Sequence, residues 1–293
     1  ARLYGHNKGI ELPTIIVMEK SFHGRTMATL TATGNRKAQA GFEPLLTGFV
    51  RVPYDDLVAV EQIAANNKNI VAVLVETYQG EGGVNIPQAT YLDGLRRLCD
   101  QNNWLLMLDE VQCGIGRTGK WFAFQHSNSS PDIITLAKGL GSGVPIGACI
   151  AKGAAADIFK PGNHASTFGG NPLACKAALT TLKVIEQDQL MQNAISMGNL
   201  MRDRFKEKLA SWSNVIKIRG QGLMLGIELP IPCGELVKEA LATKLLINVT
   251  SERVVRLLPA LVITQTEAEQ IVDTTSSIID RFLTTQYKST VLT

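Results

Sequence analysis

Three short apolar runs in this sequence each end abruptly at a charged residue, and this feature constrains the fold more than any other. The runs are residues 70–75 before Glu76, residues 105–108 before Asp109 and Glu110, and residues 133–137 before Lys138. Short apolar runs between turn residues are typical of strands buried in a parallel sheet. In open α/β sheets, ligands bind at the carboxyl ends of the strands. We therefore expect an acid and a lysine, each at the end of a buried strand, to contribute to one shared site.

The residue types alone leave simpler interpretations open. An aspartate at a strand end is more often a helix cap or a turn former than a catalytic group, and a lysine before a glycine is usually a solvated loop residue. The glycines at 139, 141 and 143 break the G-x-G-x-x-G spacing of dinucleotide-binding proteins, and they do not end in the Gly-Lys-Ser/Thr of a P-loop. A nicotinamide oxidoreductase and a P-loop protein are therefore disfavoured.

Composition argues against several other classes of protein. The 293 residues are 45% hydrophobic and 19% charged, which suits one large or two ordinary globular domains. The net charge of +3 comes from basic and acidic residues mixed along the chain, so we expect no nucleic-acid partner. The sequence has no run of about 18 apolar residues and no charged-then-apolar start, so we expect neither a membrane span nor a signal peptide, and a cytoplasmic location. The cysteines form no Cys-x-x-Cys pair and the histidines show no ligand spacing, which favours reduced thiols and no metal.

The remaining pattern predicts a large α/β domain followed by a smaller α+β domain. Residues 91–103 have leucines at helical spacing and lead directly into the next apolar run, so strand, helix and strand form a βαβ crossover. Residues 29–54, punctuated by Gly, Thr and Pro, are expected to form a long loop region. Short strands and a final capped helix come later, so we place the domains at residues 1–212 and 213–293. Inside one of these later strands, Arg256 must either extend to water or meet an anion.

Six motifs occur in one order along nearly the whole chain. They are residues 21–26 (SFHGRT), 79–83 (QGEGG), 108–112 (LDEVQ), 137–139 (AKG), 166–172 (STFGGNP) and 255–259 (VRLLP). In this order they resemble the class III aminotransferases that use pyridoxal 5′-phosphate (PLP), and six ordered matches are far more specific than one glycine motif. The resemblance implies the fold type I architecture of aspartate aminotransferase, with a large, mostly parallel-sheet domain and a smaller C-terminal α+β domain. Within the family, the chain is most similar to the enzymes that act on acetylornithine.

The resemblance implies PLP as the cofactor and suggests a role for each residue around it. PLP works as an electron sink, while the protein supplies attachment, orientation and electrostatics. Lys138 is expected to bind the cofactor covalently and then to shuttle a proton between the substrate carbon and the cofactor. Asp109 is expected to pair with the pyridine nitrogen and favour its protonated form. The other expected cofactor-binding residues are Gln112 at the phenolic oxygen, Val111 and Phe22 on the two ring faces, and Thr167 at the phosphate.

The same resemblance implies which residues bind the substrates. Arg256 is expected to hold an α-carboxylate by a bidentate pair of hydrogen bonds, and Glu81 to neutralise Arg256 when an ω-amine reacts. Arg25 and Ser166 are the other expected substrate-binding residues. The implied reaction moves the terminal amino group of N2-acetylornithine to 2-oxoglutarate, giving glutamate, in arginine biosynthesis. Because Thr167 is expected to reach the cofactor of a neighbouring subunit, the resemblance also implies a homodimer with shared sites.

The sequence departs from the family pattern in ways that leave alternatives open. The family's Gly-Ala-Glu-Ala-Asn phosphate loop is expected just before Ala1, outside this sequence, and Thr77 replaces a proline that is common after Glu76. Amides at a helix N-terminus normally carry much of the phosphate binding, so we expect a chain without that loop to hold PLP weakly or not at all. The alternatives are a related enzyme acting on succinylornithine, ornithine or 4-aminobutyrate, an aminomutase, and a catalytically incomplete fragment.

Overall fold

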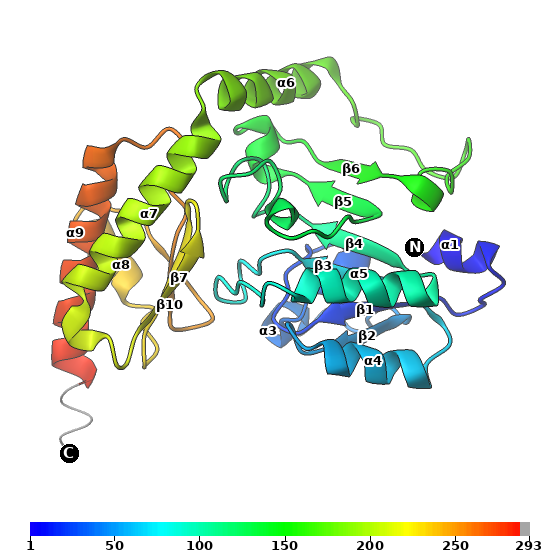
Figure 1. The fold of residues 1–293 in the computed structure, drawn as a ribbon, viewed down its shortest axis with the longest axis horizontal. Helices are drawn as coiled ribbons and strands as arrows, with labels where there is room; N and C mark the ends of the chain where they lie inside the picture. The colour runs from blue at the N-terminus through cyan, green and yellow to red at the C-terminus, as the bar shows by residue number, and fades with distance from the viewer. Residues whose placement is uncertain (288–293) are drawn as a thin grey trace. The chain divides into compact units, whose positions relative to one another are not determined.

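The structure, a computed structural model, describes residues 1–287 and divides into two units (Figure 1). Unit 1 consists of Ala1–Gly80, Pro87–Ile115 and Phe122–Val184. Unit 2 consists of Glu81–Ile86, Gly116–Trp121 and the chain from Ile185 onward. This division differs from the expected boundary at residue 212, because helix α7 (Leu190–Lys208) packs on helix α9 (Gln265–Phe282) within unit 2. The last six residues of the expected C-terminal domain, 288–293, lie outside the described residues.

A six-stranded sheet forms the centre of unit 1. Its strand order is β2-β1-β3-β4-β5-β6, and neighbouring strands are parallel except for β5 and β6. The strands are β1 (Thr14–Met18), β2 (Phe49–Val52), β3 (Ile70–Glu76), β4 (Leu105–Asp109), β5 (Ile133–Leu136) and β6 (Ala148–Ala151). The predicted mostly parallel α/β sheet is therefore confirmed. Because the three apolar runs become the adjacent parallel strands β3, β4 and β5, the residues that follow them lie at one edge of the sheet.

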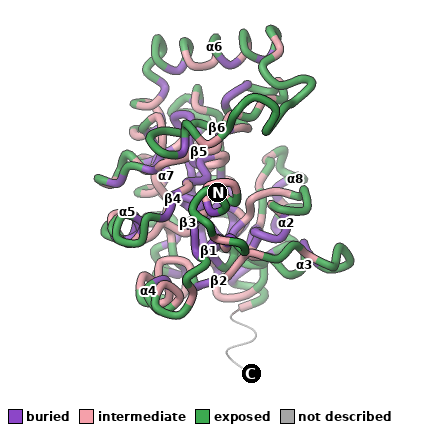
Figure 2. The backbone as a smooth tube through the Cα atoms, turned by 90° about the vertical axis from the view of Figure 1, so that its right-hand side faces the viewer, coloured by how far each residue is buried: buried purple, intermediate pink, exposed green. Residues whose placement is uncertain are grey.

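Both faces of this sheet are covered by packed side chains. Because side chains alternate between the faces along a strand, neighbouring residues of one strand belong to different cores. On one face, Met18 of β1 belongs to a core that includes helices α4 (Leu57–Asn66) and α5 (Tyr91–Asn102). On the other face, Val17 of β1 belongs to a core that includes Ala32. The central strands β1, β3 and β4 are largely buried, and Figure 2 shows this part of the chain mostly in purple. Burial on both faces explains why these strands are nearly continuous apolar runs in the sequence.

Residues 29–54 do not form the long loop that the sequence predicted. They include the end of α2 (Met27–Ala32), all of α3 (Arg36–Gln39) and the edge strand β2. Arg51 of β2 donates a hydrogen bond to the carbonyl oxygen of Thr33 at 3.0 Å, which attaches the strand to the residue after α2. The prediction was wrong because elements of four to six residues are too short to show a periodic apolar pattern.

Unit 2 is built on a four-stranded antiparallel sheet with the strand order β7-β8-β10-β9. Its further elements are β7 (Lys217–Gln221), β8 (Met224–Glu228), α8 (Leu236–Ala242), β9 (Asn248–Thr250) and β10 (Val254–Leu257). Phe205 of α7 and Ile279 of α9 are fully buried in one core with the sheet. The predicted capping box of α9 is confirmed, because Thr264 Oγ1 accepts a hydrogen bond from the Glu267 N–H and the Glu267 carboxylate accepts one from the Thr264 N–H.

The long helix predicted from Pro172 is α6 (Pro172–Gln187), and Asn171 caps it by accepting a hydrogen bond from the Ala174 N–H at 2.9 Å. The 3-10 segments are η1 (Ala123–His126), η2 (Lys138–Gly141), η3 (Gly153–Ala155) and η4 (Ala210–Trp212), and a π-helical turn, η5 (Leu283–Tyr287), follows α9.

Within residues 1–287, no helix is both long and apolar enough to cross a membrane. The same residues contain no group of three His, Cys, Asp or Glu side chains suited to a metal ion, and the cysteines are free thiols.

Candidate active site

Asp109 ends one strand of unit 1 and Lys138 follows the neighbouring parallel strand, at the same edge of the sheet. Asp109 is the last residue of β4 and pairs with Thr135 of β5, which ends one residue later at Leu136. Lys138 then opens η2 and is exposed. Its backbone φ is 44°, in the left-handed region that residues other than glycine rarely adopt. The structure therefore leaves the Lys138 amine available to a ligand, beside the strand that ends at Asp109.

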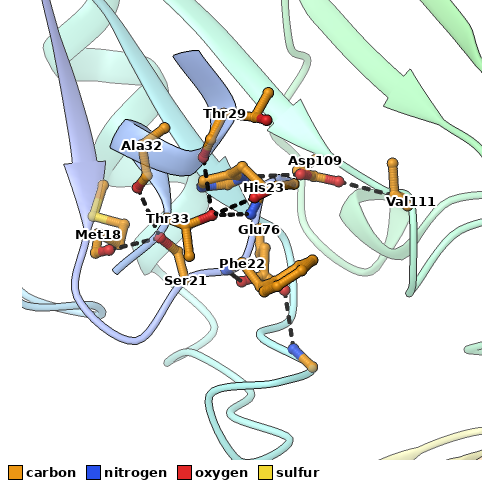
Figure 3. A network of polar contacts seen from close by, with 12 residues as sticks. Met18, Ser21, Phe22, His23, Thr29, Ala32, Thr33, Glu76, Asp109 and Val111 are labelled. Carbon is orange, nitrogen blue, oxygen red and sulfur yellow. Dashed lines mark hydrogen bonds and ion pairs between the residues drawn. The ribbon is translucent and has the colours of Figure 1, made fainter. Parts of the chain in front are cut away.

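The Asp109 carboxylate is almost fully buried and is held on both sides (Figure 3). Its Oδ2 lies 2.7 Å from Nδ1 of His23, and its Oδ1 accepts a hydrogen bond from the Val111 N–H at 3.0 Å. A carboxylate has about four lone-pair positions, so these contacts leave capacity for a further donor. The other ring nitrogen of His23 is buried with no hydrogen-bond partner in the described part of the chain. Asp109 is therefore an oriented acceptor that can still bind a ligand.

Glu110, the second acid after this apolar run, has a structural role. Its side chain is fully buried and accepts hydrogen bonds from Thr77 Oγ1 and from the N–H groups of Ala123 and Phe124, each at 2.8 Å. Burial raises the pKa of Glu110, although these hydrogen bonds oppose the rise. Side chains of consecutive extended residues point in opposite directions, so Asp109 and Glu110 face different surroundings. Glu110 therefore holds η1 in place through its hydrogen bonds, and Asp109 is the acid that belongs to the candidate site.

Glu76, the last residue of β3, connects two segments that carry expected site residues. Its Oε1 accepts a hydrogen bond from the Phe22 N–H at 2.8 Å, and its Oε2 accepts one from the Gly80 N–H at 3.0 Å (Figure 3). Burial raises the pKa of Glu76 to about 7. Gly80 packs closely on the end of the Gln112 side chain, because an added Cβ at position 80 would lie 1.9 Å from Oε1 of Gln112 and would displace the amide. Glu76 thus fixes the backbone that carries the Phe22 ring and the backbone that packs on the Gln112 amide.

The side chains expected to contact a cofactor ring are only partly buried. Phe22, Val111 and Gln112 all have intermediate exposure. The guanidinium carbon of Arg25 lies 5.7 Å from the centre of the Phe22 ring, a distance typical of a cation–π contact. Residues of intermediate exposure beside an oriented carboxylate leave surface that a flat ligand can cover.

Ser166 and Thr167 lie in an exposed loop that precedes α6. Ser166 Oγ accepts a hydrogen bond from the Gly169 N–H at 3.1 Å, within the loop itself. Among residues 1–287, neither side chain is hydrogen-bonded to Asp109 or Lys138. Their expected roles at the substrate and at the phosphate of a neighbouring subunit stay predictions.

In unit 2, Arg256 of β10 is buried and paired with an acid. Its Nη1 lies 2.8 Å from Oε1 of Glu81, and its Nη2 donates a hydrogen bond to Oδ1 of Asn248 at 2.9 Å. Of the two possibilities that the sequence left open for Arg256, the structure therefore shows the anionic partner. The expected Glu81–Arg256 ion pair is present, and its role in substrate binding stays a prediction.

Two residues at this site were not assigned a role from the sequence. His23 contacts Asp109, and Glu76 binds the segments that carry Phe22 and Gly80. The signal for Glu76 was present, because it is an acid that ends an apolar run just as Asp109 does. The signal for His23 was its place inside the first of the six motifs. What the sequence could not show is which backbone amides and carboxylates the fold brings to them.

Comparisons with known proteins identify the family of this chain. Residues 1–279 match the family described as aminotransferase class-III. Acetylornithine aminotransferase of Nitrosomonas europaea is 73% identical over 288 residues, which cover 98% of this chain and 73% of that protein. Acetylornithine aminotransferase 1 of Bordetella pertussis is 51% identical over 286 residues, with the same coverage. A crystal structure of Toxoplasma gondii ornithine aminotransferase, described as having partial occupancy of PLP at its active site, has a TM-score of 0.89 and 36% identity and covers 98% of this chain and 69% of its own.

The shared architecture confirms the expected fold type of PLP-dependent aminotransferases. The family and its solved relatives also imply PLP as the cofactor and small molecules as the substrates. The match along nearly the whole chain confirms the resemblance that six motifs indicated. The chain therefore belongs to the class-III aminotransferase family.

Proposed function

We propose that this aminotransferase moves the terminal amino group of N2-acetylornithine to 2-oxoglutarate, giving glutamate and an N-acetylated semialdehyde. The observation that carries the reaction type is the placement of Asp109 at the end of β4 and of Lys138 just after the neighbouring parallel strand β5. The names of the relatives at 73% and 51% identity support the choice of amine donor. This donor would place the reaction in arginine biosynthesis, and a cytoplasmic location stays a prediction.

The chemistry of the described side chains fits PLP. When bound, PLP supplies an electron sink for the electron pair of a cleaved C–H bond. The oriented carboxylate of Asp109 suits a protonated pyridine nitrogen, and the exposed amine of Lys138 suits an aldehyde carbon. The other side chains suit the cofactor ring. Gln112 would donate a hydrogen bond to the phenolic oxygen, and Phe22 and Val111 would pack on the two faces of the ring.

Lys138 and Asp109 divide the proton chemistry in this proposal. With PLP bound, the Lys138 amine would accept the proton from the substrate carbon and would later donate it back. Asp109 keeps a proton on the pyridine nitrogen, because a nearby negative charge favours the protonated base. His23 and the Val111 N–H hold the carboxylate in one orientation, so little reorganisation is needed during the reaction.

The Glu81–Arg256 pair would let the protein accept two kinds of substrate. While the two side chains are paired, the charge of Arg256 is neutralised, which suits the reaction of an ω-amine. When Glu81 turns away, Arg256 offers a planar bidentate donor to a carboxylate of glutamate or 2-oxoglutarate. We assign further substrate contacts to Arg25 and Ser166.

We also propose a homodimer in which Thr167 of one subunit binds the cofactor phosphate of the other. The region around the Thr167 loop exposes large apolar side chains, namely Ile150, Phe159, Phe168, Leu173 and Leu179. Figure 2 likewise shows α6 as a largely exposed helix. Exposed large apolar side chains are typical of a protein–protein interface. Light scattering should give a dimer mass for the protein and a monomer mass for Leu173→Glu, and a monomeric parent protein would contradict the proposal.

The proposed reaction is tested by measuring glutamate formation from 2-oxoglutarate with a panel of amine donors. We expect kcat/KM for N2-acetylornithine to exceed that for ornithine and 4-aminobutyrate by at least about tenfold. Lys138→Ala is the control for activity that does not depend on the site. A preference for ornithine or 4-aminobutyrate would replace the proposed donor. No glutamate with any of these donors would contradict the proposed transamination altogether.

A further inference from the structure

The segment that carries Glu81 is fixed at its backbone while the Glu81 side chain stays partly open. Residues Glu81–Ile86 belong to unit 2. The carbonyl oxygen of Glu81 accepts hydrogen bonds from Thr250 Oγ1 and, at 3.3 Å, from Ser251 Oγ. The Glu81 side chain is 38% exposed, whereas that of its partner Arg256 is 8% exposed. The acid can therefore leave the pair by rotating its side chain, without a shift of its backbone.

Arg219 of β7 holds the next residues of this segment. Its Nε donates hydrogen bonds to the carbonyl oxygens of Gly83 at 3.1 Å and Val84 at 2.9 Å, and its Nη2 donates to Gly83 at 2.6 Å. Its Nη1 donates to Oε2 of Glu228 at 2.6 Å. A guanidinium has five donors in a fixed plane, so one Arg219 side chain can span two carbonyl groups and a carboxylate.

Val84 shows how firmly this segment is held. Its φ is 54°, a conformation that β-branched residues rarely adopt, and its side chain is fully buried. It packs on Gly226 of β8, where an added Cβ would lie 2.8 Å from the Cβ of Val84. Strained backbone of this kind persists only where the surrounding contacts over-determine it. The hydrogen bonds from Arg219 to the Val84 and Gly83 carbonyl groups supply such contacts.

We infer that Arg219 is a positioning residue that sets which substrate the Glu81–Arg256 pair admits. Because Arg219 holds Gly83 and Val84, the Glu81 carboxylate returns to the same contact with Arg256 each time the pair closes. A loosened segment would neutralise Arg256 less well and so disfavour the ω-amine, while a substrate that binds Arg256 with Glu81 turned away would be affected less. The inference rests on the proposed function, since it assigns Arg219 to the selection between the amine donor and the dicarboxylate.

The test is Arg219→Lys, which keeps a positive charge near Glu228 but cannot span both carbonyl groups. We expect a roughly tenfold loss of kcat/KM in the N2-acetylornithine half-reaction and less than about threefold in the 2-oxoglutarate half-reaction. Single-turnover absorbance changes of the PLP-loaded protein measure the two half-reactions separately. We also expect faster hydrogen exchange at the amides of residues 82–85, which is a readout that does not depend on activity.

Two further variants control this experiment. Arg253→Lys is the matched control, because Arg253 pairs at 3.3 Å with the other oxygen of the Glu228 carboxylate, and we expect both half-reactions to stay unchanged. Glu228→Gln removes the acid that orients Arg219, and we expect it to shift the ratio of the half-reactions as Arg219→Lys does, by a smaller factor. An active parent protein with an unchanged ratio in Arg219→Lys would overturn the inference. A parent protein that is inactive with both substrates would instead refute the proposed function.

Discussion

The two units of this protein place their reactive polar groups in different ways. In unit 1, Asp109 ends β4 and is buried against His23 and the Val111 N–H, whereas Lys138 follows β5 and is exposed. In unit 2, Arg256 lies inside an antiparallel strand, is buried, and is bound by Glu81 and Asn248. A charge inside a strand requires a partner, because burying an unpaired ion is costly, and both Asp109 and Arg256 have one. Lys138, which follows its strand, can stay open to a ligand. Unit 1 thus presents an exposed amine beside an oriented carboxylate, whereas in unit 2 the charge of Arg256 is neutralised by Glu81.

This difference predicts two kinds of variant. Changes at the reactive groups of unit 1 should lower the rate with every amine donor, because those groups act on atoms that all substrates share. Changes at the ion pair of unit 2 should alter the preference between substrates, because the pair decides only whether Arg256 binds Glu81 or a substrate carboxylate. Comparing the rates of each variant with two different substrates distinguishes the two kinds of variant.

Lys138→Ala should have the largest effect. Loss of the amine that binds the cofactor and moves the proton should lower kcat by at least about 10³-fold with every amine donor. The melting temperature should change little, because Lys138 is exposed. Steady-state kinetics and thermal unfolding test both statements. A variant that keeps more than a tenth of the activity would exclude Lys138 from the chemistry.

Asp109→Asn should have the next largest effect. It keeps the size of the side chain but removes the charge that favours a protonated pyridine nitrogen, so we expect kcat to fall by roughly 10²–10³-fold. The loss should be the same with N2-acetylornithine and with glutamate as donors. A loss confined to one donor would move Asp109 from the shared chemistry to substrate selection.

The pH dependence of stability should differ in sign between the units. Burial raises the pKa of Glu76 in unit 1 to about 7, so its contribution to stability is full at acidic pH and is lost as the pH rises through 7. The free energy of unfolding relative to Glu76→Gln should therefore fall by roughly 1–3 kcal/mol between about pH 4.5 and pH 7. Urea unfolding across this range measures it, and a flat difference would show that Glu76 does not titrate there.

Glu228 of unit 2 gives the opposite sign and serves as the comparison. Burial alone would raise its pKa, but the hydrogen bond and charge of Arg219 outweigh burial and lower it. The stability that Glu228 contributes is therefore present at neutral pH and is lost as the pH falls through its lowered pKa. The difference between the protein and Glu228→Gln should shrink in acid. Equal signs for Glu76 and Glu228 would remove this contrast between the units.

Glu81→Gln should have a smaller effect, and only on substrate preference. It leaves Arg256 without its acidic partner, so we expect kcat/KM for N2-acetylornithine to fall by about tenfold, while the half-reaction with 2-oxoglutarate stays within about threefold. Single-turnover measurements of the two half-reactions provide the ratio. A parallel fall in both half-reactions would place Glu81 with the shared chemistry of unit 1.

Thr264→Ala should have the smallest effect and should not change the chemistry. It removes one half of the capping box of α9, which should lower the free energy of unfolding by about 1 kcal/mol. Activity at a temperature well below unfolding should stay unchanged. Altered substrate preference in this variant would show that α9, and not only the ion pair, influences selection.

The sequence predicted the elements whose residues carry a strong local pattern. The runs before Glu76, Asp109 and Lys138 form adjacent parallel strands. They were predictable because a strand buried on both faces needs nearly continuous apolar residues. Residues 29–54 were predicted wrongly, because strand β2 is short and takes its stability from pairing with β1, which the local sequence does not show. The placement of Glu81–Ile86 in unit 2 was equally hidden, since it depends on contacts with distant strands.

The candidate site shows the same limit at the level of single side chains. Asp109 and Glu110 are adjacent acids after one run, and only the fold shows that one meets His23 while the other anchors η1. The motifs supplied the expected Glu81–Arg256 pair through resemblance, but local spacing gave no sign of it. Long-range geometry therefore decides the roles of residues that look equivalent in the sequence.

The most direct test of the proposed chemistry is borohydride reduction of the PLP-loaded protein, followed by peptide mass spectrometry. We expect the absorption band of the bound cofactor to disappear on reduction and the reduced adduct to lie on Lys138. An adduct on a different lysine, or a protein of correct mass that shows no band with added PLP, would contradict the assignment of Lys138 and the proposed transamination with it.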